Sequence, residues 1–262
     1  MVFPPQRIVC LTEETVETLY LIGARDHIVG VTGYAVRPPE VRREKTRVGA
    51  FTSADIDKIV SLAPDLVLTF SDLQADIAAD LIQRGLAVHA FNQRTIAEIL
   101  DMIRTLGALV DARAKAEQLV ATLSTRLEEA RHAGQSLRRQ PRVYFEEWDD
   151  PPICGINWVS ELIGIAGGID IFAEQAASRD AKGRIVSHEN IIAGAPDLII
   201  GSWCGKKFRP ERLAARPGFA AIPAVRDAAL FEIKSPLILQ PGPAALTDGL
   251  DALQKIVSSR FA

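Results

Sequence analysis

One segment of this chain occurs twice. Residues 57–68, DKIVSLAPDLVL, are matched in register by residues 189–200, ENIIAGAPDLII, about half a chain later. Each copy begins with an acid, continues with two apolar residues and reaches Ala-Pro-Asp-Leu before a further apolar pair. Helix-to-strand turns favour Pro and Asp, so a single copy could arise by chance. Two copies in register predict two lobes of similar construction, each with a short helix that turns into a strand.

Short apolar runs alternate with helical segments in both halves. Strands are predicted over 8–11, 28–31, 66–70 and 87–91, and again over 143–148, 198–201 and 230–233. Helices are predicted to follow Thr12 and to cover 55–62, 72–84, 158–166, 189–193 and 244–257. Strands separated by helices favour a parallel α/β sheet in each half.

The middle of the chain is helical only. A helix is expected over 95–106, and a longer one is expected to be capped by Asp111 and to end at Gly134. Its apolar stripe, at the 3.6-residue period, consists of Ala116, Leu119, Val120, Leu123, Leu127 and Ala130. The predicted fold class is therefore α/β, with two Rossmann-like lobes joined by a single long helix. The predicted domains are an N-terminal lobe over 1–94, an inter-lobe helical segment over 95–140 and a C-terminal lobe over 141–262.

Composition excludes several classes of partner. A net charge of −3 and an isoelectric point near 5.9 give no electrostatic case for nucleic acid or an anionic membrane. No apolar run is long enough for a membrane helix, so no membrane insertion is expected. The first residues lack the basic and apolar regions of an export signal. The chain is then either an exported protein whose signal was trimmed or, if Met1 is native, a cytoplasmic one.

Catalytic and metal-binding motifs are not found. The chain has no CxxC, HExxH, GxSxG or P-loop motif, and its four histidines are scattered. Glu146 and Glu147 alternate in a strand, so they cannot form a carboxylate pair on one face. We expect no intrinsic cofactor, no built-in metal site and no enzyme activity.

Several short motifs recur in an order typical of one family. They are residues 7–11, 30–34, the two Pro-Asp segments, 166–168, 222–225 and 240–243. In order and spacing the chain resembles the cluster A, or class III, substrate-binding proteins of ABC importers, which bind cobalamin, haem or ferric siderophores. The vitamin B12 receptors of that family are the most similar in pattern. The resemblance implies a ligand cleft between the lobes, an ABC permease and ATPase as partners, a periplasmic location and a monomer.

Candidate ligand-binding residues lie where strands are predicted to end, because α/β sheets bind ligands beyond the carboxyl ends of their strands. They are Tyr34, Phe51, Phe70, Trp148, Asp149, Trp203, Cys204 and Lys206. The resemblance implies that the first three match aromatic positions around a corrin, although Phe51 and Phe70 could equally be core residues. Trp203 and Cys204 are expected to line a pocket rather than to be buried.

The remaining polar candidates have two interpretations each. Lys206 could meet a phosphate or carboxylate of the ligand, or could be solvated together with Lys207. Cys204 could ligate a metal or, in an exported protein, pair with Cys154.

Two acidic residues have a different predicted role. The resemblance implies that Asp57 and Glu189 project from the two lobes and pair with arginines of the permease dimer. The alternative is that both only stabilise helix N-termini, where carboxylates are favourable.

The sequence thus predicts a binding protein for a cobalt corrinoid, most simply cobalamin, that serves an ABC importer. Three alternatives stay open: a haem or ferric-siderophore binder, a cytoplasmic corrinoid-binding protein without a transport role, and a chelatase-like enzyme of tetrapyrrole metabolism. The sole acid–base candidate for the enzyme is His188 beside Glu189.

Overall fold

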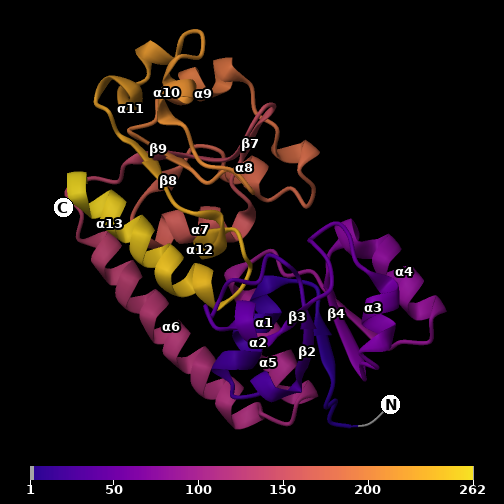
Figure 1. Cartoon of the computed structure of the whole chain (residues 1–262). Helices are drawn as coiled ribbons and strands as arrows, with labels where there is room; N and C mark the ends of the chain where they lie inside the picture. The colour runs from indigo at the N-terminus through magenta and orange to yellow at the C-terminus, as the bar shows by residue number, and fades with distance from the viewer. Residues whose placement is uncertain (1–2, 262) are drawn as a thin grey trace. The chain divides into compact units, whose positions relative to one another are not determined.

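The computed structural model describes residues 3–261, which form two compact units (Figure 1). Unit 1 holds the described residues up to Gln93 together with Ala97–Thr122, and unit 2 holds Arg94–Ile96 and the chain from Leu123 onward. Each unit has its own sheet flanked by helices. The predicted fold class, two α/β halves, is confirmed.

Unit 1 is built on a five-stranded parallel sheet in the order β3-β2-β1-β4-β5. Its strands are β1 (Ile8–Cys10), β2 (Ile28–Val31), β3 (Thr46–Arg47), β4 (Leu66–Phe70) and β5 (Val88–Phe91). Its helices are α1 (Glu13–Leu21), α2 (Val41–Glu44), α3 (Ile56–Ser61), α4 (Ala75–Gln83) and most of α5 (Ile96–Leu109). The order reverses between β1 and β4, and such switch points are where open α/β sheets bind ligands.

The sheet of unit 2 has the order β10-β9-β6-β7, and β8 pairs with the first residues of β6. The strands are β6 (Arg142–Asp149), β7 (Pro152–Cys154), β8 (Ile169–Asp170), β9 (Leu198–Gly201) and β10 (Leu230–Glu232). The helices of unit 2 are α7 (Asn157–Ile165), α8 (Ala173–Ala176), α9 (His188–Gly194), α10 (Pro210–Ala214), α11 (Pro223–Arg226), α12 (Ser235–Ile238) and α13 (Leu250–Phe261).

After the predicted strand over 143–148 the structure has a further strand, which the sequence did not predict. The chain turns back as β7, which pairs antiparallel with β6 so that Ile153 lies opposite Trp148. Proline cannot donate a ladder hydrogen bond and is tolerated at the edge of a sheet. Pro152 occupies such an edge position, so its presence did not exclude a strand.

The predicted long helix is α6 (Arg113–Gln135), and it contributes to both units, with the boundary between Thr122 and Leu123. Its predicted apolar stripe is buried, except for the half-buried Leu119. In unit 2 it runs alongside α13, and Arg126 forms an ion pair with Asp251 (Figure 1).

Both predicted ends of α6 were misplaced. Asp111 has a left-handed φ of 56° and lies in the turn before the helix, so it is not the cap. Gly134 does not end the helix. A Cβ there would lie 2.7 Å from the backbone nitrogen of Gly167, so glycine is needed for close packing of the two backbones.

The sequence repeat is also a structural repeat. The helices α3 and α9 end in the same way, with Ala63 and Ala195 in left-handed conformations at φ 44° and 41°. Asp65 and Asp197 follow two residues later, and each carboxylate accepts a backbone hydrogen bond from the start of a central strand. The distances are 3.0 Å from the nitrogen of Arg7 to Asp65 Oδ2 and 2.8 Å from that of Arg142 to Asp197 Oδ2.

The two arginines complete the repeated unit. Arg7 Nε donates to the carbonyl of Leu62 at 3.1 Å, and Arg142 Nε donates to the carbonyl of Gly194 at 2.8 Å. Helix C-termini leave carbonyls without partners, and a guanidinium there satisfies them. An arginine at the start of the central strand and an aspartate just before the neighbouring strand therefore fasten helix to sheet in both units.

Candidate functional site

At the carboxyl edge of the unit 2 sheet, the hairpin between β6 and β7 lies beside the loop that follows β9. The strands β6 and β9 pair in parallel up to Glu146 and Gly201, so residues 148–150 and 202–206 emerge next to each other. The nitrogen of Ser202 donates to the carbonyl of Glu146 at 2.9 Å, and that of Cys204 donates to the carbonyl of Glu147 at 3.1 Å. Backbone hydrogen bonds thus hold the loop after β9 against β6.

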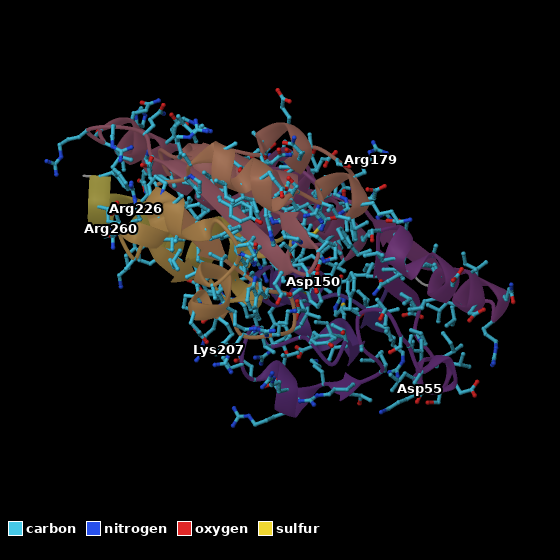
Figure 2. The ribbon with its side chains drawn as sticks, turned by 90° about the horizontal axis from the view of Figure 1, so that it is seen from above. Asp55, Asp150, Arg179, Lys207, Arg226 and Arg260 are labelled. Carbon is cyan, nitrogen blue, oxygen red and sulfur yellow. The ribbon has the colours of Figure 1, made fainter. Side chains whose placement is uncertain are left out.

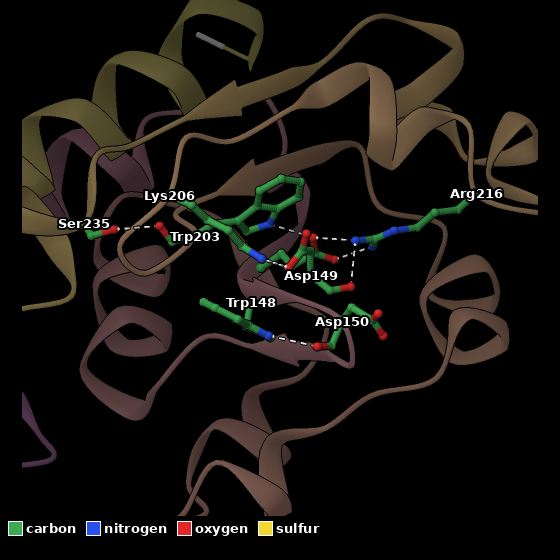
Figure 3. Close-up of polar contacts among 8 residues, drawn as sticks. Trp148, Asp149, Asp150, Trp203, Lys206, Arg216 and Ser235 are labelled. Atoms are coloured by element: carbon green, nitrogen blue, oxygen red, sulfur yellow. Dashed lines mark hydrogen bonds and ion pairs between the residues drawn. The ribbon is translucent and has the colours of Figure 1, made fainter. Parts of the chain in front are cut away.

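Trp148, Asp149 and Lys206 come together at this edge (Figure 3). The ammonium of Lys206 lies 3.8 Å from the centre of the Trp148 ring and forms an ion pair with Asp149. The indole nitrogen of Trp148 donates to the carbonyl of Asp150 at 2.9 Å. Burial alone would raise the pKa of Asp149, but the hydrogen bond and charge of Lys206 outweigh it and lower the pKa. Asp149 is therefore a stable anion at neutral pH.

Beneath this group lies a buried ion pair that the sequence analysis missed. Glu146 has no exposed surface, and Arg216 donates to both of its carboxylate oxygens, at 2.6 and 3.0 Å. Tyr144 Oη and Trp203 Nε1 each donate to the same carboxylate at 2.9 Å. Burial, the charge of Glu146 and its hydrogen bond raise the pKa of Tyr144 well above the usual value, so the phenol stays a donor.

Arg216 also reaches the last residue of β6. Its second terminal nitrogen donates to the carbonyl of Asp149 at 3.1 Å, beside its bond to Glu146 (Figure 3). The signal that could have revealed this was Glu146 itself, because a carboxylate inside an apolar strand requires a partner. No local pattern indicates that the partner lies 70 residues away.

Glu147 has a different partner, as strand alternation predicts. Arg184, which is 4% exposed, forms an ion pair with Glu147 at 2.5 Å and donates to the carbonyl of Cys154 at 2.8 Å. The long segment before α9 is thereby fastened to β6 and β7. The two glutamates thus bind arginines from two different segments of unit 2.

Trp203 lies in the core of unit 2, against the expectation that it lines a pocket. It is 2% exposed, packs edge-on against Phe208 with ring centres 5.1 Å apart, and its carbonyl accepts from Ser235. Cys204, the next residue, is exposed, Cys154 is buried, and no disulfide joins the two.

At the edge of unit 1, Tyr34 is 53% exposed, Phe51 is half-buried and Phe70 is buried. Gln74 ties the strand ends together. Its amide oxygen accepts from the nitrogen of Phe70 at 2.9 Å, and its amide nitrogen donates to the carbonyls of Phe51 at 2.7 Å and Leu11 at 3.2 Å. Tyr34 and Phe51 are thus the aromatic side chains of this edge with accessible surface, and Phe70 fits the core alternative.

A buried acid follows β1 at the same edge. Glu14 is almost fully buried and accepts a hydrogen bond from the hydroxyl of Thr12 at 2.6 Å. Burial raises the pKa of Glu14 to about 7. Its neighbour Glu17 is paired with Arg37 at 2.9 Å. This edge therefore carries less negative charge at neutral pH than its sequence suggests.

Asp57 and Glu189 occupy equivalent positions in the first turns of α3 and α9, and both side chains are exposed. The helix N-termini are already capped by Asp55 and Ser187, whose side chains accept from backbone nitrogens of the first turn. Asp57 also pairs with Arg84 at 3.1 Å, and its side chain is 84% exposed. Hydrogen bonds from its own backbone and from Ser187 lower the pKa of Glu189.

A cavity of about 480 Å³ lies in unit 2 away from these loops. Its lining includes Gln140, which precedes β6, and Gly167, which precedes β8, so it adjoins the amino ends of the strands. Within residues 3–261, no group of three or more His, Cys, Asp or Glu side chains is placed to hold a metal ion. Among the helices of the same residues, none has both the length and the apolar character to cross a membrane.

Comparisons with known proteins cover nearly the whole chain. The family model described as "Periplasmic binding protein" matches residues 8–237. An uncharacterized ABC transporter substrate-binding lipoprotein, YvrC of Bacillus subtilis, is 26% identical over 97% of this chain and 80% of its own length. A vitamin B12-binding protein of Vibrio cholerae is 26% identical over 97% of this chain and 88% of its own length. The periplasmic heme-binding protein RhuT from Roseiflexus sp. RS-1 has a similar fold, with a TM-score of 0.82, 24% identity and coverage of 96% and 99% of the two chains.

Proposed function

Because the chain belongs to the periplasmic binding protein family, we propose that it binds a metal chelate, a cobalamin or another corrinoid, and delivers it to an ABC permease and ATPase. The observation that carries the proposal is the set of aromatic side chains with accessible surface at the carboxyl edge of each sheet. These are Tyr34 and Phe51 in unit 1 and Trp148 in unit 2. The vitamin B12-binding relatives support the choice of corrinoid.

The residues at the two sheet edges offer aromatic contact area and polar groups, both of which suit a flat macrocycle. Aromatic side chains contribute large contact area at little cost in side-chain entropy, which favours them where a rigid ring is bound. Lys206 contacts Trp148 and Asp149, and Cys204 is exposed in the same loop as Lys206. In this proposal the three residues supply the polar contacts that fix the orientation of the ligand. Phe70 and Trp203 are buried, and in this proposal they support the surface from below. The proposal keeps the predicted lobes, 1–94 and 141–262, with 95–140 as the segment that connects them.

Several alternatives differ only in the ligand or the compartment. A haem or ferric-siderophore binder would use the same edges, and a cytoplasmic corrinoid-binding protein would do so without a permease. Family membership places the chain among binding proteins rather than enzymes, so the chelatase-like alternative is dropped. Consistent with this, the ring of His188 packs edge-on against Phe219, with ring centres 5.1 Å apart. In the importer proposal the protein acts outside the cytoplasmic membrane as a monomer.

Titration with chelates tests the proposal. Cyanocobalamin, dicyanocobinamide, haem and a ferric siderophore are each added while tryptophan emission is followed. We expect one of them to quench the emission with one-to-one stoichiometry and without turnover. Tyr34→Ala should weaken that binding about tenfold, since a central aromatic contact is lost. Tyr34→Phe, which keeps the ring, is the matched control. Flat emission with all four ligands at about 50 µM, where micromolar affinity would give a clear signal, would refute chelate binding.

Replacing both Asp57 and Glu189 by alanine should reduce uptake of the chelate by cells about tenfold, because exposed charges orient docking. Chelate affinity of the purified protein should not change, since neither residue is among the proposed ligand-binding residues. Asp26→Ala removes an equally exposed carboxylate elsewhere and is the control. Unchanged uptake in the double variant would show that the two acids serve only their helices.

A further inference from the structure

Lys206 covers the aromatic surface on which the proposed ligand would stack. Its ammonium lies 3.8 Å from the centre of the Trp148 ring and 5.5 Å from that of Trp203. Both distances are within the range of cation–π attraction. Asp149 fixes the ammonium from the side through an ion pair, and the loop is closed by a hydrogen bond from the nitrogen of Lys206 to the carbonyl of Trp203 at 3.2 Å.

These contacts differ in how easily they can be broken. Trp203 is buried, and Asp149 is held through its carbonyl by Arg216, so both belong to the fixed part of unit 2. Lys206 is exposed and stands on a flexible four-carbon side chain after Gly205, whose φ of 73° favours glycine. The lysine is therefore the part that moves when a ring approaches Trp148.

Moving Lys206 has an electrostatic consequence. An ammonium displaced from both the indole and Asp149 loses its two attractive partners, while Asp149, mostly buried, loses its counter-ion. A ligand that offers an anionic group to the displaced ammonium offsets this loss, whereas an uncharged ring does not. Hydrogen bonds between charged groups are stronger than those between neutral groups. A chelate with an anionic group should therefore bind much more tightly than an uncharged one.

We propose that Lys206 is a specificity-determining residue, which covers Trp148 in the empty protein and selects flat chelates that carry a peripheral phosphate or carboxylate. The inference rests on the proposed function, because it assumes that a chelate stacks on Trp148. The anionic group could be the phosphodiester of a cobalamin or a carboxylate of haem, and the two sources are separated by titration.

The cover itself is tested without ligand. Trp158 and Trp203 are each 2% exposed, so acrylamide should quench Trp148 almost alone. Lys206→Ala should raise the quenching constant of that emission about twofold, since the face of the indole is uncovered. Asp149→Asn should raise it by a smaller amount, because the ammonium is no longer anchored. The control is Lys207→Ala, which removes the adjacent exposed lysine (Figure 2). Equal quenching of Lys206→Ala and wild type would overturn the inference whatever the ligand.

The selection is tested with cyanocobalamin, which carries the phosphodiester, dicyanocobinamide, which lacks it, and haem, which carries two carboxylates. Lys206→Ala should weaken binding of the anionic ligand about tenfold, as expected for loss of one charge-assisted hydrogen bond. Dicyanocobinamide should bind as tightly as before or a few times more tightly. Lys206→Arg should retain most of the preference, and Lys207→Ala all of it. If Lys206→Ala loses affinity for cyanocobalamin alone, the phosphate is the partner of Lys206. If it loses affinity for haem alone, the partner is a carboxylate.

The two proposals fail in different ways. If wild type binds none of these chelates but Lys206→Ala uncovers Trp148, the proposed function is wrong and the cover is real. If wild type binds a chelate and Lys206→Ala changes its affinity for charged and uncharged ligands equally, the proposed function stands and the selection by Lys206 is refuted.

Discussion

Replacing Arg216 by alanine is expected to lower the free energy of unfolding by about 3–5 kcal/mol, because it leaves the charge of Glu146 buried without a counter-ion. Glu146 has no exposed surface, and three side chains donate to its carboxylate. Tyr144 and Trp203 would remain, but neither carries a positive charge. Urea unfolding, followed by circular dichroism, measures the loss of unfolding free energy. The chelate affinity of the folded variant reports the effect on the end of β6, which Arg216 holds through the carbonyl of Asp149.

The double variant Glu146→Gln, Arg216→Met is the control. It removes both charges together and leaves an amide that can still bond to Tyr144 and Trp203. Replacing a whole buried pair is far less damaging than breaking it, so the double variant should unfold within about 1–2 kcal/mol of wild type. If Arg216→Ala alone is that stable, the carboxylate is satisfied without the guanidinium and the assigned role of Arg216 is wrong.

Replacing Asp197 by alanine should cost about 2–3 kcal/mol, since one charge-assisted contact and one backbone contact are lost. Its carboxylate accepts from the guanidinium of Arg139 at 2.8 and 3.0 Å and from the nitrogen of Arg142. Asp65→Ala, at the equivalent place in unit 1, removes only contacts to backbone nitrogens and should cost about 1–2 kcal/mol. Equal losses of unfolding free energy in Asp197→Ala and Asp65→Ala would show that the contact with Arg139 does not stabilise the protein.

The loss at Asp197 should depend on pH. Burial alone would raise the pKa of Asp197, but Arg139 and the backbone of Arg142 outweigh it, so the pKa is lowered on folding. A group with a lowered folded pKa stabilises the protein above its unfolded pKa, and this contribution disappears as the pH falls through the folded value. The difference in unfolding free energy between wild type and Asp197→Ala should therefore be largest at neutral pH. It should shrink below about pH 4, the ordinary range of an aspartate pKa. A gap that is constant down to about pH 2 would contradict the assignment.

Local signals predicted most of the regular structure. The strands β2, β4 and β9 begin and end where apolar runs flanked by turn residues placed them. The repeat at 57–68 and 189–200 predicted the relation between the two units, which the structure shows in the paired Ala63 and Ala195 turns. These features depend on residues close together in sequence, and propensity and periodicity report on them directly.

The features that were missed depend on distant partners. The strand β7 forms only because β6 is beside it, and the short helices α8, α10, α11 and α12 are each too short to show a period. The positions of Arg184 and Arg216 could not be predicted, because their partners Glu147 and Glu146 lie far away in sequence. The burial of Trp203 has the same origin, since Phe208 and Glu146 enclose it.

Neighbouring glutamates on β6 are held by arginines from two different segments, Arg184 before β9 and Arg216 after it. Because the two ion pairs hold opposite faces of β6, the end of the strand resists rotation about its own axis. Trp148, one residue further on, is therefore pre-organised, and an incoming ring need not spend binding free energy on ordering that part of its contact surface.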